Sequence, residues 1–509
     1  MGFNDAKLVA SGLIAMSTLV ACGRPAEDGE QAADDTITAS DALRVRRPPR
    51  LLAPLSTSIS TSRRPLFQWQ PGGDRRATVQ ICRDRACRHL IADIDTADSS
   101  VRPAHALPAG VVFWRVTSRW PGRHADSSAV WQLTIPARDS GRAGSWGATP
   151  DFNGDGLSDL AVGAKLTAEM RIFPGRPGGP SATPAQTLSG PLGFGDEAGP
   201  AGDVDGDGFG DLAVWTSGPP QTVTVYRGGP NGLASPVTFA APEADSFSQM
   251  RVLSAGDVNG DGYGDLLVGG RANAALHLGG PAGVQTTPVE LLPNGGTDAR
   301  WPIGGGDFDG DGFVDAVIAG VDAGRLYTGN GRRLIARPGV TITPPFFGAL
   351  AGDFNGDGLA DLAMGGAILA GGPTGLEPFQ AIAGAFFYQG VGDVNGDGFS
   401  DALAMISSLF GVLEAERVYF GGTTPCTSTD CPTFVPLLVP GHLNDGNGQA
   451  AVLGGGLGDL NGDGYGDIAY ISPGAGAVYL FFGSAGGPPQ APSRTIAAEQ
   501  GFGFSLARL

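Results

Sequence analysis

Seven nine-residue segments of the 509-residue sequence carry oxygen-bearing side chains at one alternating spacing. They begin at residues 151, 203, 257, 307, 353, 393 and 459, and the first two read DFNGDGLSD and DVDGDGFGD. Positions 1, 5 and 9 are always Asp, position 3 is Asp or Asn, and positions 4 and 6 are always Gly. Glycine permits the positive φ angles of a tight turn, so alternate side chains can converge on one point. Because Ca²⁺ takes roughly six to eight hard oxygen ligands, the segments predict up to seven calcium sites.

Each predicted site uses the side chains at positions 1, 3, 5 and 9 and the backbone carbonyl at position 7. We expect the large apolar side chains at position 7 to pack each loop onto its own sheet. The predicted metal ligands are Asp151, Asn153, Asp155, Leu157, Asp159, Asp203, Asp205, Asp207, Phe209, Asp211, Asp257, Asn259, Asp261, Tyr263, Asp265, Asp307, Asp309, Asp311, Phe313, Asp315, Asp353, Asn355, Asp357, Leu359, Asp361, Asp393, Asn395, Asp397, Phe399, Asp401, Asp459, Asn461, Asp463, Tyr465 and Asp467.

Two alternatives compete with this interpretation. An EF-hand loop needs a carboxylate at position 12 and flanking helices, whereas position 12 is here Val, Ile, Met, Ala or Tyr within a strand-like run. A plain Asp/Asn/Gly turn without metal needs only one or two such residues, which seven complete copies exceed. Seven Ca²⁺ ions would add 14 positive charges and change the net charge from −18 to −4.

The amino-acid composition limits the possible fold classes and binding partners. The 84 glycines disfavour helices, because each helical Gly costs about 1 kcal/mol relative to Ala. Lys and Arg number 33 against 51 Asp and Glu. This acidic balance argues against nucleic-acid binding, which needs basic grooves.

The segments recur at intervals of 52, 54, 50, 46, 40 and 66 residues, a spacing typical of a solenoid, array or propeller. Strand-like runs such as 223–226 and 478–482 follow each segment, and Gly-rich turns such as 228–233 follow those. This pattern resembles the FG-GAP (VCBS-like) repeats of the integrin α-subunit head and of bacterial relatives, over residues 143–509. The resemblance implies an all-β fold, a seven-bladed β-propeller with Ca²⁺ in loops between adjacent strands. We expect the strand-like run 502–507 to complete the first blade and close the ring.

Residues 50–137 carry several alternating runs, including 66–69, 77–81, 111–116 and 130–135, which are typical of a small β-sandwich. The run GVVFWRV, with Trp-containing strands before and after it, resembles fibronectin type III modules. We expect this module to act as a spacer.

Four of the five cysteines form two C-x4-C pairs, which predict disulfides Cys82–Cys87 and Cys426–Cys431 in an oxidising compartment. Buried free thiols and a zinc site are the alternatives.

Cys22 follows a short apolar run, and LVAC resembles the bacterial lipobox, which implies a signal peptide over 1–21 and lipidation of Cys22. An ordinary secretory signal is the alternative. Residues 22–49 would form a disordered stalk, and the protein would be anchored by lipid to the bacterial cell envelope, at the outer membrane or cell surface.

The sequence contains neither HExxH nor G-x-S-x-G, and its five histidines are dispersed. We therefore predict no enzyme. A rigid propeller face suits adhesion or recognition of a protein or polysaccharide. The alternatives are a structural scaffold of the envelope and a secreted carbohydrate-active enzyme.

Overall fold

The computed structural model describes residues 47–72, 76–118, 125–139, 145–146, 148, 150–242, 251–296, 299, 301–320, 323–342, 349–364, 367–381, 385–407, 413–424, 434–439, 453–472, 475–499 and 501–507. Every regular element in these residues is a β-strand, so the all-β prediction is confirmed. Residues 46–509 belong to one compact unit.

The N-terminal module consists of two sheets with a shared core. Its strands are β1 (Arg50–Ala53), β2 (Ser58–Ser60), β3 (Phe67–Gln70), β4 (Ala77–Cys82), β5 (Leu90–Thr96), β6 (Ser100–Val101), β7 (Gly110–Ser118), β8 (Asp126–Ser127), β9 (Trp131–Ile135) and β10 (Ser145–Trp146). The smaller sheet has the order β1-β3-β6 and the larger β10-β2-β9-β7-β4-β5, with β8 beside β7. The alternation of β3 buries Phe67 and Trp69, and Phe67 stacks on Trp114 of the larger sheet with ring centroids 4.8 Å apart.

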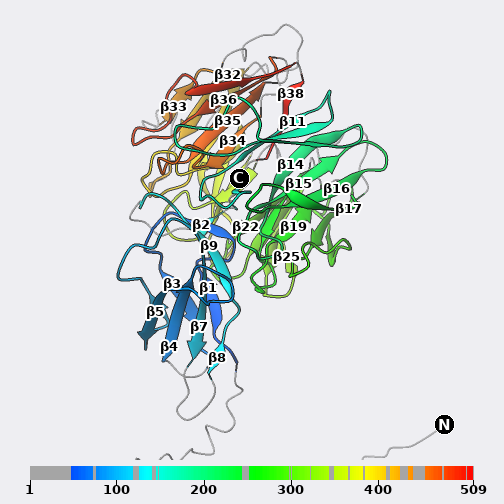
Figure 1. The fold of residues 1–509 in the computed structure, drawn as a ribbon. Coiled ribbons are helices and arrows are strands. Elements are labelled where there is room, and N and C mark those ends of the chain that lie inside the picture. Colours follow the sequence, from blue (N-terminus) through cyan, green and yellow to red (C-terminus); the bar gives the residue numbers. More distant parts are fainter. Residues whose placement is uncertain are drawn as a thin grey trace, which may run out of the picture. The chain divides into compact units, whose positions relative to one another are not determined.

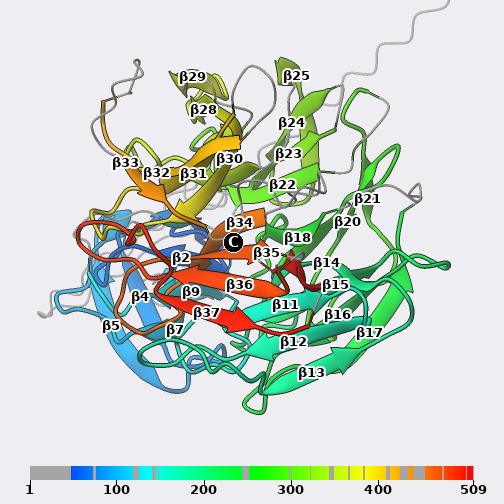
Figure 2. The ribbon, with the colours of Figure 1, turned by 90° about the horizontal axis from the view of Figure 1, so that it is seen from above.

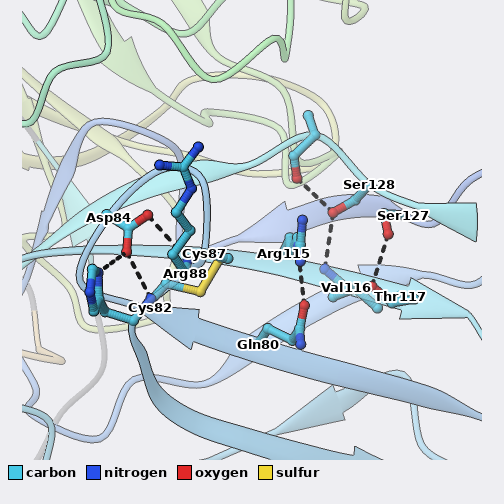
Figure 3. The surroundings of a disulfide bond; sticks show 12 residues. Gln80, Cys82, Asp84, Cys87, Arg88, Arg115, Val116, Thr117, Ser127 and Ser128 are labelled. Atoms are coloured by element: carbon cyan, nitrogen blue, oxygen red, sulfur yellow. Dashed lines mark hydrogen bonds and ion pairs between the residues drawn. A yellow bond between two sulfur atoms is a disulfide. The ribbon is translucent and has the colours of Figure 1, made fainter.

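Three sequence-based expectations bear on this module. The four predicted strands are confirmed as β3, β4, β7 and β9. The disulfide Cys82–Cys87 is present and closes the turn after β4 (Figure 3). Strand β10 pairs with β2, so residues 145–146 lie in this module although we expected the repeat domain to begin at 143.

The remaining strands form seven four-stranded antiparallel sheets, here called repeat sheets 1 to 7. They are β11 (Leu160–Ala164), β12 (Glu169–Phe173), β13 (Gln186–Ser189) and β38 (Phe502–Leu506); β14 (Phe194–Gly202), β15 (Asp211–Thr216), β16 (Thr222–Arg227) and β17 (Ala234–Ala240); β18 (Val252–Gly256), β19 (Asp265–Val268), β20 (Ala274–His277) and β21 (Glu290–Leu292); β22 (Trp301–Gly306), β23 (Asp315–Ala319), β24 (Gly324–Gly329) and β25 (Leu334–Ile342); β26 (Ala349–Gly352), β27 (Asp361–Met364), β28 (Ala367–Ala370) and β29 (Glu377–Ala381); β30 (Ala385–Gly392), β31 (Asp401–Ser407), β32 (Leu413–Tyr419) and β33 (Phe434–Leu437); and β34 (Leu453–Gly458), β35 (Asp467–Ser472), β36 (Ala477–Phe481) and β37 (Arg494–Ala497).

The repeat sheets follow one another around a ring in chain order (Figures 1 and 2). Apolar clusters fill the spaces between neighbouring sheets, and one of them continues into the core of the N-terminal module. Strand β38 pairs with β11, as predicted for the C-terminal run, and Phe502 is fully buried between sheets 7 and 1. This pairing completes sheet 1 and covers the edge of β11.

Candidate metal centres

The seven acidic segments lie where the sequence predicts, and we call them acidic loops 1 to 7. Loops 2 to 7 each connect the first and second strands of a repeat sheet, whereas loop 1 precedes β11, the strand that pairs with β38. In six of them the second strand begins at the Asp of position 9. Because the strands are antiparallel, the connections between the third and fourth strands share the face of these loops. The connections between the second and third strands, and from one sheet to the next, lie on the opposite face.

The position-1 carboxylate organises each loop by accepting hydrogen bonds from backbone amides. In acidic loop 2, Asp203 Oδ1 accepts from the amides of Gly206 and Asp207 at 2.6 and 3.1 Å, and Oδ2 accepts from Gly208 at 2.8 Å. The bond from the position-6 amide recurs in all seven loops. All fourteen glycines at positions 4 and 6 have positive φ, so the side chains of other residues would strain these turns.

Positions 3 and 5 are held in the same way. In acidic loop 2, Asp205 Oδ1 accepts from the Asp207 amide at 3.3 Å, and Asp207 Oδ1 accepts from the Phe209 amide at 3.0 Å. Equivalent bonds occur in the other six loops. Each of these bonds uses one lone pair, so oxygen lone pairs remain available for a ligand.

The position-9 carboxylate connects three parts of its sheet. Asp211 Oδ2 accepts from the Val204 amide at 2.7 Å, and its Oδ1 accepts from the amide of Gly228, after the third strand, at 2.8 Å. The same two bonds occur in every loop. Position 9 therefore stabilises the sheet as well as offering a candidate ligand.

Burial places these carboxylates in a costly environment. Burial raises the pKa of Asp159 and that of Asp315 to about 8, and the pKa of Asp361 to about 7. Burial is also the main reason that the pKa of Asp151 at position 1 rises to about 6. Neighbouring loop carboxylates raise each of these pKa values further. A divalent cation would compensate several like charges at once.

The donor set fits Ca²⁺ in its chemistry. Carboxylate oxygens of Asp203, Asp205 and Asp211 lie within 4.8 Å of one another, as do those of Asp307, Asp309 and Asp315. In the other five loops position 3 is Asn, whose amide oxygen is an equally hard ligand.

Neighbouring loops are joined by backbone hydrogen bonds. The position-8 amide of one loop donates to the position-1 carbonyl of the preceding loop, as from Gly210 to Asp151 at 2.7 Å. Six such bonds are present among the described residues, and the bond from Ser158 to Asp459 joins the first loop to the last. These six bonds link the seven acidic loops in one series that runs from loop 4 through loops 7 and 1 to loop 3, which the nine-residue pattern alone did not reveal.

The expectation for position 7 is incomplete. Phe313 packs against Gly331 of its own sheet, as expected, but other side chains at this position also contact the preceding loop. A Cβ at Gly154 would lie 2.5 Å from the ring of Phe209, and one at Gly206 would lie 2.6 Å from the ring of Tyr263. The physical reason is the bare Gly at position 4, which leaves room for the neighbour's side chain.

Arginines of the N-terminal module contact the same face. Arg85 donates to the carbonyls of Gly206 and Gly262 at 2.8 and 2.6 Å, and its guanidinium lies 4.4 Å from the ring centroid of Tyr263. Arg50 lies over Phe313, and Arg138 over Tyr465. The module therefore covers part of the acidic-loop face. Composition gave no signal for these contacts, and the interpretation of this module as a simple spacer did not anticipate them.

Several predicted residues lie outside the described residues, namely Cys22, Cys426 and Cys431. No helix among the described residues is long and apolar enough to cross a membrane.

Comparison with known families supports the repeat assignment. A family model described as an FG-GAP-like repeat matches residues 203–268 and 307–364, and one described as an FG-GAP repeat matches residues 143–168. These matches, with the homologues below, support a relation to the FG-GAP and integrin α-like family. Such repeats form β-propellers, and those of integrin α subunits bind Ca²⁺.

The similar curated proteins include integrin α subunits. Integrin alpha-5 of Xenopus laevis is 37% identical over 122 residues, which cover 21% of this chain and 11% of that protein. Integrin alpha-IIb of Homo sapiens is 36% identical over 174 residues, 28% of this chain and 16% of that protein. The matched stretch thus spans less than a fifth of either relative.

Solved structures give more distant likenesses. A putative 6-phosphogluconolactonase from Bacteroides uniformis has a TM-score of 0.43 at 12% identity, covering 67% of this chain and 97% of that one. Rhamnogalacturonan lyase YesW has a TM-score of 0.31 at 12% identity, covering 90% of this chain and 99% of that one. At such scores neither likeness assigns a function.

Proposed function

We propose that the chain is a calcium-binding, lipid-anchored cell-surface protein that recognises a protein or polysaccharide through a seven-bladed β-propeller. The observation that carries the calcium proposal is the sevenfold recurrence of one hydrogen-bonded loop geometry with a buried carboxylate at position 9, together with the converging carboxylates of loops 2 and 4. The ligands would be the side chains of positions 1, 3, 5 and 9 and the carbonyl of position 7. Metal analysis and titration calorimetry of the purified chain test this proposal; metal-free protein that shows no calcium heat would refute it.

We place recognition on the face opposite the acidic loops. The N-terminal module, which we interpret as a fibronectin type III-like sandwich, covers part of the loop face through Arg85 and its neighbours. On the opposite face, Leu166 and Leu192 are 72% and 82% exposed. We infer that these two leucines contribute to the contact with the recognised protein.

Cell-binding assays test the recognition surface. L166D/L192D should weaken binding of the purified chain to its target cells by about tenfold or more, as is typical of central apolar anchors. L90D is the matched control, because Leu90 lies in the N-terminal module and is 49% exposed. Equal binding by the unaltered protein, L166D/L192D and L90D would refute this surface. If the unaltered protein binds no cells either with or without calcium, a structural role in the envelope is favoured.

The anchor proposal rests on the lipobox-like LVAC sequence at Cys22. C22S should move the protein from the membrane fraction to the soluble exported fraction. A variant that stays in the membrane fraction would contradict lipidation.

The proposed disulfide Cys426–Cys431 is tested by peptide mapping under non-reducing conditions.

A further inference from the structure

Two of the seven acidic loops differ from the others in charge. Loops 2 and 4 have Asp at position 3, whereas the other five have Asn. In loops 3, 5, 6 and 7 the Asn amide nitrogen donates to the position-5 carboxylate at 2.9–3.0 Å. An aspartate at position 3 has no proton to donate, so it adds a fourth carboxylate and removes a hydrogen bond.

An arginine accompanies the extra carboxylate in both loops. Arg227 Nη1 lies 3.4 Å from Asp205 Oδ2, and Arg337 Nη1 lies 2.9 Å from Asp309 Oδ2. Among the residues that the structure describes, these two are the ion pairs that join an acidic-loop carboxylate to a basic side chain. All four side chains are mostly buried, with exposed fractions between 9% and 29%, so the pairs are partly shielded from solvent.

The two arginines come from different places in their sheets. Arg227 ends the third strand of sheet 2, whereas Arg337 lies within the fourth strand of sheet 4. Each also donates to a carbonyl in the next sheet's turn, Arg227 to Ala282 and Arg337 to Pro373. The position-3 aspartate is thus paired with an arginine from a different sequence position in each of the two repeats. This points to a requirement set by the charge of the loop rather than to one arginine repeated in every sheet.

We propose that Arg227 and Arg337 are charge-matching residues that set the calcium affinity of loops 2 and 4. This inference rests on the proposed calcium function. Four ionised carboxylates and one guanidinium give a net charge of −3, the same as the three carboxylates of each Asn-containing loop. The guanidinium also holds the outer oxygen of the position-3 carboxylate, as groups outside a metal's ligand shell commonly do. Arg85 beside Asp203 and Arg50 beside Asp307 and Asp311 add further positive charge to the same two loops, so the extra carboxylate of each is compensated.

Charge matching makes opposite predictions for the two members of each pair. R227Q/R337Q leaves four uncompensated carboxylates, so two calcium equivalents should bind on the order of tenfold more tightly. D205N/D309N leaves an unpaired guanidinium beside the site, so two equivalents should bind on the order of tenfold more weakly. The fourfold variant reproduces the Asn-containing loops, and its affinity should lie within about threefold of the unaltered protein, because the two charge changes cancel.

Titration calorimetry of the full chain measures these affinities, with circular dichroism as a check on folding. R494Q is the matched control: Arg494 also bonds carbonyls of the next sheet's turn, Gly179 and Pro180, but pairs with no loop carboxylate among the described residues. It should leave calcium affinity unchanged. R227K/R337K keeps the positive charge but not the forked geometry of the guanidinium, and it should also leave calcium affinity unchanged.

A readout without calcium separates the possible failures. In EGTA, R227Q/R337Q should melt at a lower temperature than the fourfold variant, because its extra carboxylates repel one another. If calcium binds but both pairwise variants weaken it, the arginines only shape the loops and charge matching is wrong. If the unaltered protein binds no calcium at all, the proposed metal function fails, and this inference fails with it. If R227Q/R337Q or the fourfold variant does not fold, R227K/R337K and D205N/D309N still show in which direction charge changes calcium affinity.

Discussion

The metal-free protein should lose stability as the pH rises, which reverses the usual behaviour of carboxylates. Burial raises the pKa of Asp315 from 3.8 to about 8 in the folded chain. A group with a raised folded pKa contributes its stability below its unfolded pKa, and that contribution disappears as the pH passes the folded pKa. For Asp315 the window is therefore about pH 4 to pH 8, with the loss complete above pH 8.

The expected size follows from the number of such groups. At about 1.4 kcal/mol per pKa unit, ionising Asp315 in the metal-free fold costs on the order of 5 kcal/mol. Asp159 has an equally raised pKa, and the pKa of Asp211, Asp265, Asp401 or Asp467 is also well above its ordinary value. Two such costs approach the whole stability of an ordinary domain, about 5–15 kcal/mol. Without metal, the loops must therefore stay protonated or open near neutral pH.

Thermal melts at several pH values test this reasoning. In EGTA the melting temperature should fall by roughly 10 °C between pH 5.5 and pH 8. In millimolar calcium it should stay level or rise, because the ion binds the ionised loops and compensates their charge. The effect of calcium should consequently grow with pH. A metal-free melting temperature that is constant or rises over this range would refute the assignment of buried, uncompensated carboxylates.

Three further perturbations follow from the fold. F502A should lower the free energy of unfolding by about 3–5 kcal/mol in urea titrations, because Phe502 is fully buried where β38 closes the ring; a loss below about 1 kcal/mol would contradict that closure. C82S/C87S should cost about 2 kcal/mol in the same assay, and an unchanged midpoint would show that this bridge does not restrain the unfolded chain. R85A should speed hydrogen exchange of acidic loops 2 and 3, whereas R88A, which removes an exposed charge from the same module, should not; equal exchange would contradict the Arg85 contacts.

The acidic loops were predictable because their chemistry is local. Nine residues contain the oxygens, the two glycines and the Asp that begins the second strand, so spacing alone located all seven loops. Closure by β38 was also predictable, since a strand-like run without a following loop complements a loop without a preceding strand. Alternating apolar residues likewise located β3, β4, β7 and β9.

The contacts between repeats were not predictable from one sequence. Phe209 reads as a residue that packs its own loop, and only the ring geometry places it against Gly154 of the preceding loop. Arg227 and Arg85 read as ordinary surface charges, because their partners lie tens to more than a hundred residues away. Pairing of this kind depends on how strands, sheets and the N-terminal module pack, which residue periodicity does not encode.

The pairing of β38 with β11 gives the ring of repeat sheets no beginning and no end. In a linear array of repeats the outermost units have one neighbour each, and disorder spreads inward from them. A circular array has no such units, so every repeat sheet is restrained by a neighbour on either side. If the acidic loops bind calcium as proposed, occupancy should rise cooperatively with calcium concentration rather than site by site.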